Sequence, residues 1–459
     1  MSQSSSTSLA FENAGELSAQ FPKTASNAKH NYDFPLTALV IAGVLLRVAV
    51  AILAGNGMRT PWGGGGDTPA YVLLAQNILS GKGYAYAGMP TALRAPGYPL
   101  LLAACFRFFG AHALAAMRWL QFFEGIIVAL LCAAAAKKLF GKQAWKWALA
   151  IALFFPTLVQ MNGEVLSEAP ATVFTALFIY LLVSYWREPR AGWLVLLGCA
   201  IGMGALVRFN LAALGLIALV AVFRCATASK RWTGAAIVFV VSVVIVSPWI
   251  IRNFVAFHGQ VLFSTESGPD ALHGVLTPQG RALPGDSEKL RAAVGWVPPV
   301  DVETNDASRL KLGPEPELDK QCWRAAIAIA EYKGWGLIPL ALRKITDFWL
   351  STDQLFWTES FPLWGRVLRA AGVLVYWVLL GLAVFGWARL HSSHDRIARI
   401  FLLYALLVTA MHLPFVMSTR LRMPFMSPLL AILAGGGLAS VVYGNLRKNR
   451  PVLRTTAAV

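Results

Sequence analysis

A chain of 459 residues with 57% hydrophobic and only 14% charged residues differs from soluble proteins, in which about a quarter of the residues are charged. The apolar residues lie in several runs of about 20, the length of a helix that crosses a bilayer. The formal net charge is +17, but the lysines and arginines gather in short segments between these runs, without an aromatic-interleaved nucleic-acid motif. The sequence therefore predicts an all-α polytopic membrane protein and argues against a nucleic-acid partner.

The composition divides the chain into three parts. Residues 1–32 are polar and rich in Ser, Thr and Ala, without the apolar core of a signal peptide, and are expected to form a disordered cytoplasmic tail. Residues 33–445 are predicted to form the transmembrane domain and residues 446–459 a basic cytoplasmic tail. About ten spans are expected, at residues 35–54, 113–136, 143–160, 165–186, 191–207, 210–225, 233–251, 366–388, 398–415 and 424–443.

Two segments between the spans contain predicted interfacial helices. In residues 55–99, apolar residues recur at i, i+3, i+4 and i+7 from Tyr71 to Ile78, which indicates an amphipathic helix in the interface. The run 98–109 is too short to span and is expected to be a second interfacial or re-entrant helix. The polar segment 252–335 is rich in Pro, Gly and charge, and an amphipathic helix is predicted directly after it at 336–350.

The positions of the basic residues predict the topology. With a cytoplasmic N-terminus, the basic connectors and the C-terminal tail all fall on the cytoplasmic side, as the positive-inside rule requires. These residues are Lys137, Lys138, Lys142, Lys146, Arg187, Arg190, Arg224, Lys230, Arg231, Arg389, Arg396, Arg399, Arg447, Lys448, Arg450 and Arg454. Residues 55–99, 252–335 and 416–423 then share the outer face.

Asp67 is an isolated acid on this outer face, directly behind four glycines in PWGGGGDTP. Glycines allow a bulky ligand to approach the backbone closely, and a carboxylate here could take a proton from an acceptor hydroxyl as a general base. The alternative is that Asp67 only caps the following helix, which begins with Thr68-Pro69. The two roles are compatible.

Two further acids, Glu164 and Glu168, open the predicted span 165–186 at its outer end. An acid at a helix N-terminus is stabilised by the helix dipole, which is a purely structural explanation. Two acids one turn apart that face the same compartment as Asp67 also indicate a polar site, and Glu168 is expected to be the more buried of the two.

Arginines at the outer face run against the positive-inside trend, and the anionic head group of a lipid would explain them. A guanidinium group can grip a phosphate with two parallel hydrogen bonds. The structural alternative is an arginine that extends to the membrane interface. The arginines concerned are Arg94, Arg208, Arg252, Arg420 and Arg422.

Metal and redox chemistry are not indicated by the sequence. The five cysteines contain no CxxC pair, and only Cys322 falls in a large polar segment. The outer-face histidines His258, His273 and His412 lack the spacing of a metal site. No cofactor is predicted, and a divalent metal is not indicated.

Four stretches of the sequence resemble the GT-C membrane glycosyltransferases, and more closely the bacterial branch of the dolichyl-phosphate-mannose protein mannosyltransferase superfamily. That branch includes the 4-amino-4-deoxy-arabinose lipid A transferase and sugar transferases that decorate the lipopolysaccharide core. The stretches are PTALRAPGYPLLL, VLSEAPATVFTALFIYLL, SPWIIRNFVAFHGQVLFSTESG and STRLRMPFMSPLLAILAGGGL, within residues 35–443.

The resemblance implies a GT-C-type bundle and an inverting transferase that takes a sugar from a polyprenyl monophosphate on the outer face of the bacterial inner membrane. The first-loop acid of the family falls on Asp67, and with Glu168 it is the predicted catalytic pair. A second acid often follows the first in the family, but Thr68 stands there, which puts a bridged metal in doubt. The predicted donor-phosphate residues are Arg94 and Arg420, followed by Arg252 and Arg422, and the predicted substrate pocket contains Tyr71, Tyr98, Glu164 and Arg208.

Other functions remain open at this point. A lipid-linked sugar flippase or transporter would need internal repeats or paired broken helices, and the sequence has no visible repeat. A non-catalytic factor that binds lipid-linked sugars would need the arginines but not Asp67. A ligase that uses a pyrophosphate-linked glycan would share the basic outer-face site. The expected partners are a polyprenyl-phosphate-linked sugar, a lipid, glycan or protein acceptor, and membrane lipids.

Overall fold

The protein is a bundle of helices with one small hairpin of strands. The computed structural model describes residues 33–60, 66–86, 88–226, 228–276, 314–351 and 363–448. The predicted tail 1–32 and most of the tail 446–459 lie outside these residues. The elements of the first half are α1 (Asp33–Ala54), α2 (Thr68–Leu79), β1 (Ala85–Tyr86), β2 (Met89–Pro90), α3 (Gly97–Phe109), α4 (Ala113–Phe140), α5 (Ala144–Phe154), α6 (Pro156–Gly163), α7 (Glu168–Arg187) and α8 (Ala191–Val207).

The second half is also helical. It contains η4 (Phe209–Ala213), α9 (Leu214–Cys225), α10 (Arg231–Ala256), α11 (Ser267–Leu276), α14 (Glu315–Lys333), α15 (Leu337–Leu350), α16 (Leu363–Ser393), α17 (Asp395–His412) and α18 (Thr419–Lys448). The antiparallel pair β1–β2 is the one sheet among the described residues. The all-α polytopic prediction is confirmed.

Each predicted span corresponds to a helix or a pair of helices. The predicted span 398–415, which forms α17, is not among the candidate membrane spans, whereas Glu315–Leu350, which was not predicted to cross, is one of them. In the described part of the chain, seven helical units are long and apolar enough to span a membrane, or eight if the bent pair α5–α6 forms one span. Helices α8 and η4–α9 are apolar but shorter. Helices form at the three positions predicted to be interfacial, as α2, α3 and α15, but by length and composition α3 belongs to the candidate span Gly97–Phe140 and α15 to the candidate span Glu315–Leu350.

The described parts of the predicted polar segment 252–335 contain more helix than the sequence pattern indicated. Helix α10 continues to Ala256, and α11 and α14 follow within the segment. These two helices pack on each other through a small apolar cluster that includes Leu272, Cys322 and Ile329. The sequence pattern missed them because α11 is short and α14 is rich in polar residues, so packing rather than hydropathy stabilises them.

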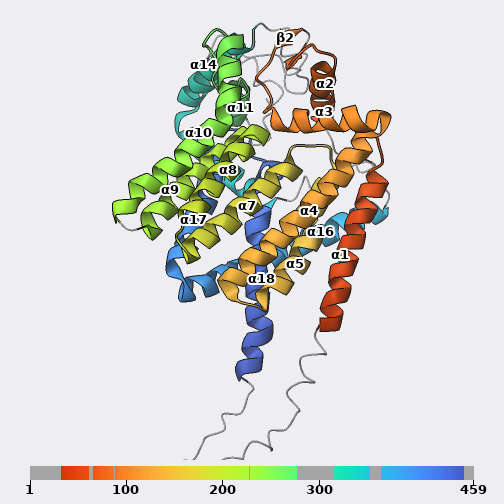
Figure 1. Ribbon diagram of the computed structural model, residues 1–459, viewed down its shortest axis with the longest axis vertical. Helices are drawn as coiled ribbons and strands as arrows, with labels where there is room; N and C mark the ends of the chain where they lie inside the picture. Colours follow the sequence, from red (N-terminus) through yellow and green to blue (C-terminus); the bar gives the residue numbers. More distant parts are fainter. Residues whose placement is uncertain are drawn as a thin grey trace, which may run out of the picture.

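Figure 1 shows that different helices lie at the two ends of the long axis of the bundle. Helices α2, α3, α11 and α14 gather with β2 at one end, drawn at the top. The first turn of α1 and the last turn of α18 lie at the opposite end. The segments predicted to share one membrane face therefore do lie at one end of the molecule.

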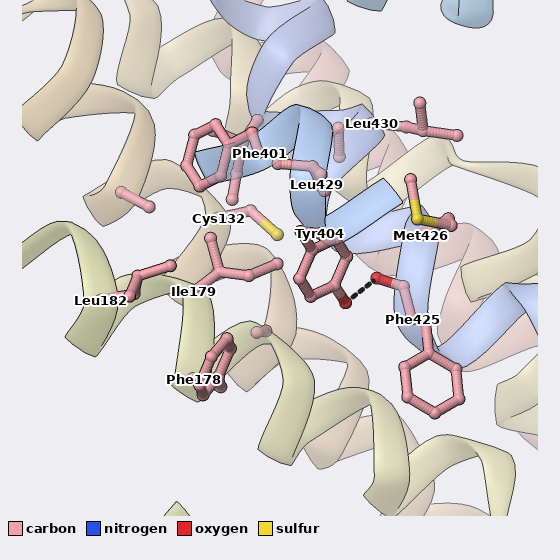
Figure 2. Packing of buried hydrophobic residues seen from close by; sticks show 14 of the residues in the cluster. Cys132, Phe178, Ile179, Leu182, Phe401, Tyr404, Phe425, Met426, Leu429 and Leu430 are labelled. Atoms are coloured by element: carbon pink, nitrogen blue, oxygen red, sulfur yellow. Dashed lines mark hydrogen bonds between the residues drawn. The ribbon is translucent and has the colours of Figure 1, made fainter. Parts of the chain in front are cut away.

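The main core lies between α4, α5, α7, α8 and the C-terminal helices, with α18 buried over most of its length. Small residues allow the close packing typical of membrane helices: a Cβ added at Gly386 would lie 1.9 Å from the carbonyl oxygen of Leu433. Figure 2 shows the centre of this core, where Tyr404 of α17 donates a hydrogen bond of 2.7 Å to the carbonyl oxygen of Phe425 in α18.

Arg47, a charge inside the apolar α1, stabilises the break between α5 and α6. Pro156 has no N–H group, so it leaves the carbonyl group of Ala152 without its helical partner. The fully buried guanidinium of Arg47 donates to the carbonyl oxygens of Ala152 at 2.7 Å, Leu153 at 3.0 Å and Leu158 at 3.1 Å. Helix α6 leads from this break into the linker that contains Glu164 and precedes α7, so Arg47 supports the region in which the acids lie.

We expect Arg47→Met to lower the free energy of unfolding by about 3 kcal/mol or more, because several buried carbonyl groups lose their donors. The check is the thermal unfolding midpoint in detergent, with the exposed Arg59→Met as the matched control. A midpoint within about 1 °C of the wild type would contradict this role.

Candidate functional site

The loop that carries Arg94 is held from two other parts of the chain. Arg252 of α10 donates to the carbonyl oxygens of Thr91 at 2.7 Å and Tyr84 at 2.6 Å. Glu315, at the start of α14, accepts a hydrogen bond of 2.9 Å from the backbone N–H of Ala92. The backbone that leads to Arg94 is therefore fixed before any ligand arrives.

Asp67 stands at the N-cap position of α2, but its side chain makes no capping hydrogen bond. Its Oδ1 accepts from Nη2 of Arg94 at 3.2 Å, and its Oδ2 accepts from Nη2 of Arg420. The capping alternative is thus not realised by the side chain. Instead, one carboxylate joins two guanidinium groups that lie 27 and 353 residues away in the chain.

The two arginines continue this arrangement outward. Nε of Arg420 donates to Oε1 of Glu168 at 2.5 Å, and Nη1 of Arg208 lies 2.8 Å from the same oxygen. On the other side, Nη1 of Arg94 donates to Oε1 of Glu266 at 2.6 Å. The resulting chain of alternating charges, here called the charge network, is Glu266–Arg94–Asp67–Arg420–Glu168–Arg208. It contains three carboxylates and three guanidinium groups, so its formal charges cancel.

The charge network is accessible at its centre and buried at one end. The side chain of Asp67 is 26% exposed and that of Arg420 is 24% exposed, whereas that of Glu168 is only 4% exposed. An incoming ligand can therefore reach Asp67 and Arg420, while Glu168 anchors Arg420 from below.

The arginines control the protonation of Asp67. Burial by itself raises the pKa of this carboxyl group, but the guanidinium groups of Arg420 and Arg94 outweigh burial and hold the pKa well below its usual range. Asp67 is therefore a carboxylate at any physiological pH.

Glu164 has the opposite electrostatic environment. It lies in the linker between α6 and α7, is 6% exposed, and accepts a hydrogen bond of 2.9 Å from Nε2 of Gln160. Burial raises its pKa to about 7, against the smaller opposing effects of Gln160 and Arg420. It is thus poised between its two protonation states near neutral pH.

A pocket lies beside Arg420 and contains both glutamates. Its lining residues are Gln160, Met161, Glu164, Leu166, Glu168, Arg420 and Met423. Oε2 of Glu168 is buried and accepts no hydrogen bond from the residues that the structure describes. The pocket wall therefore contains a carboxylate oxygen that has no hydrogen-bond partner among the described residues.

The two tyrosines of the predicted pocket lie behind the charge network rather than in this pocket. Tyr71 is 5% exposed; its hydroxyl lies 3.1 Å from Oγ of Ser167, and its ring centre is 5.8 Å from the guanidinium carbon of Arg94. Tyr98 is fully buried and packs edge-on against Tyr71. Both support α2 and α3 from within the core.

Two of the predicted phosphate-binding arginines have other contacts. Arg252 stacks on Trp249 and Tyr84 and holds the Arg94 loop as described above. Arg422 is 2% exposed, donates to the carbonyl oxygen of Phe348, and lies 4.6 Å from the ring centre of Tyr376. Their positions give both a structural role, because neither guanidinium belongs to the charge network.

The sequence analysis missed Glu266 and Glu315. Glu266 lies just before α11, and Glu315 binds the hydroxyl of the neighbouring Thr265 at 2.9 Å as well as Ala92. Both acids fall in a charged segment where no local pattern distinguishes them from solvated residues. The one available signal was the motif STESG, which contains Thr265 and Glu266.

Comparison with known proteins places this geometry in a family context. Residues 93–251 match the family model of dolichyl-phosphate-mannose-protein mannosyltransferases. This range contains Arg94, Glu164, Glu168 and Arg208 but not Asp67 or Arg420. No curated protein sequence matches the chain.

Two of the solved structures that the chain matches contain a polyprenyl phosphate. The oligosaccharyltransferase AglB of Archaeoglobus fulgidus, in complex with an inhibitory peptide and a dolichol-phosphate, matches with a TM-score of 0.51 and 14% identity over 93% of this chain and 52% of its own. ArnT from Cupriavidus metallidurans bound to undecaprenyl phosphate matches with a TM-score of 0.41 and 16% identity over 89% of this chain and 79% of its own. The chain spans about half the length of AglB.

The likeness to AglB at this identity shows a common fold. Residues 93–251 are similar to the dolichyl-phosphate-mannose-protein mannosyltransferase family, and the fold is similar to that of AglB.

Proposed function

We propose that the protein is an inverting glycosyltransferase that moves a sugar from a polyprenyl-phosphate carrier to an acceptor hydroxyl at the outer face of a bacterial cytoplasmic membrane. The observation that carries the proposal is the bridge of Asp67 between Arg94 and Arg420 beside a pocket with two glutamates. AglB, which shares the fold, holds a dolichol-phosphate in its solved structure, and this lipid is a polyprenyl phosphate of the proposed kind.

Arg94 and Arg420 are suited to bind the donor phosphate. Departure of the sugar converts a phosphodiester with one negative charge into a monoester with about two. Fixed guanidinium groups stabilise this growing charge most effectively, because they are oriented before the reaction begins. Since two such groups supply the positive charge, the reaction as proposed does not need a metal ion.

Asp67 holds the two guanidinium groups side by side, which their mutual repulsion would otherwise oppose. A carboxylate whose pKa lies well below its usual range is a poor proton acceptor near neutral pH. In place of the general-base role expected from the sequence, we therefore assign Asp67 the polarisation of the acceptor hydroxyl, together with orientation of the arginines.

The experiment that tests the proposal uses the purified protein in proteoliposomes with radiolabelled polyprenyl-phosphate sugars. The wild type is expected to release free polyprenyl phosphate, by transfer to an added acceptor or by slow hydrolysis to water. Lipid, glycan and protein acceptors in separate reactions would identify the acceptor class.

Two outcomes would contradict the proposal. Movement of the intact donor across the bilayer without release of polyprenyl phosphate would indicate a flippase. Release from pyrophosphate-linked glycans alone would indicate a ligase.

A further inference from the structure

The acceptor hydroxyl must lose its proton as its oxygen attacks the sugar, and a residue with access to the pocket has to receive that proton. We propose that this residue is Glu164, and that the pocket which Glu164 lines admits the acceptor hydroxyl. The inference rests on the proposed transferase function and assigns Glu164 as a further catalytic residue.

The backbone around Glu164 is firmly positioned. The side chain of Gln121 in α4 donates to the carbonyl oxygen of Glu164 at 2.7 Å, and the backbone N–H of Leu166 donates to the same oxygen at 2.9 Å. The linker is therefore tied to α4, which directs the Glu164 side chain into the pocket wall.

The carboxylate of Glu164 shares the pocket with the guanidinium group that contacts Asp67. Arg420 lines the pocket and also donates to Asp67, so one guanidinium group connects the pocket that Glu164 lines with the charge network. An acceptor that enters the pocket can present its hydroxyl to Glu164 while a phosphate lies on Arg420. The proposed base and the guanidinium group that contacts the leaving phosphate thus line the same pocket.

The charged groups that face Glu164 come from two elements. Arg420 of α18 favours its ionised form and Glu168 of α7 disfavours it, while burial dominates both and raises the pKa to about 7. Glu168 itself is held by Arg420 and Arg208, and Asp67 by Arg420 and Arg94. Glu164 is therefore the carboxylate in this pocket that can exchange a proton near neutral pH, and two carboxyl groups with divergent pKa values are typical of divided roles in catalysis.

The O–H bond of the acceptor breaks and its proton passes to the carboxylate of Glu164, while the acceptor oxygen forms a bond to the anomeric carbon. The bond between that carbon and the phosphate oxygen breaks, and its electron pair leaves with the polyprenyl phosphate. Protonated Glu164 then returns the proton to water.

The test is the pH dependence of kcat for Glu164→Gln at saturating donor and acceptor. In the wild type, ionisation of the base predicts a rate that rises about tenfold per pH unit and levels off near the pKa of about 7. Glu164→Gln should lower kcat by about 10²- to 10⁴-fold and remove this inflection. Glu164→Asp should retain the inflection at a lower rate, because it keeps a carboxylate in a displaced position.

Two further measurements distinguish a catalytic role of Glu164 from a purely structural one. Binding of undecaprenyl phosphate to Glu164→Gln should stay within about threefold of the wild type, because the arginines are unchanged. The thermal midpoint at about pH 8 should not fall, because a carboxyl group whose pKa is raised by burial costs stability once it is ionised above that pKa.

The assignment is overturned if Glu164→Gln retains kcat within about threefold of the wild type. It is also overturned if both variants lose undecaprenyl-phosphate binding, which would make Glu164 a structural residue. Failure of the wild type to release polyprenyl phosphate from any donor would instead remove the proposed transferase function, and the role of Glu164 with it.

Discussion

Replacement of Asp67 by Asn is expected to lower sugar transfer by roughly 10³-fold, because it removes the charge that holds Arg94 and Arg420 together. The asparagine amide keeps one acceptor oxygen but directs N–H groups at a guanidinium, which only donates hydrogen bonds. The two arginines should then move apart, so the affinity for the donor and kcat are both expected to decrease. The measurement is the release of polyprenyl phosphate at saturating donor, together with the affinity for the donor lipid.

The matched control for this substitution is Asp347→Asn on α15. Asp347 pairs with Arg343 at 4.0 Å on the protein surface, so its loss should change the rate less than about twofold. Equal thermal midpoints of the two variants would show that the fold persists. Asp67→Asn with a rate within about tenfold of the wild type would remove Asp67 from the proposed site.

Arg420→Lys is the second substitution with a large expected effect, a decrease in kcat of about 10²- to 10³-fold. Arg420 contacts Asp67 and Glu168 through different nitrogens of one planar group. A lysine ammonium is a single point of charge on a flexible chain and cannot reproduce this planar bridge. The leaving phosphate would then meet a positive charge that is not oriented in advance.

Arg422→Lys is the natural control, because it makes the same change two residues away on α18. Its guanidinium lies against Tyr376 and Phe348 in the core, so the substitution should lower the thermal midpoint. The folded fraction should retain kcat within about threefold of the wild type. If Arg422→Lys lowers kcat as much as Arg420→Lys does, the distinction between the catalytic and the structural arginine is wrong.

These two arginines also illustrate the limit of sequence reasoning. Residues i and i+2 of a helix point about 200° apart, so Arg420 and Arg422 could never serve the same site on one face. Periodicity alone does not say which of the two faces the site, because that depends on how α18 packs against its neighbours. The prediction therefore treated both as phosphate ligands, and the structure separates them.

Local properties of the sequence were sufficient for the membrane architecture. The length of an apolar run predicts whether a helix can cross the bilayer, and the distribution of basic residues predicts which connectors are cytoplasmic. Both predictions use local sequence and need no knowledge of long-range contacts. Local sequence also indicated Asp67, Arg94 and Arg420 as candidate site residues, because they are charged residues in segments predicted to lie on the outer face. Helices α2 and α3 followed from amphipathic pattern and length.

Only the tertiary structure decided which charges meet. Asp67 and Arg420 lie 353 residues apart, and Glu266 and Glu315 come from a charged segment without a distinguishing pattern. The raised pKa of Glu164 likewise depends on burial in the assembled bundle, not on its neighbours in sequence. The sequence by itself determined that this is a polytopic helical protein, and it predicted charged groups on one membrane face. The pairing of those groups and their protonation depend on distance and solvent exclusion, and both exist only in the folded chain.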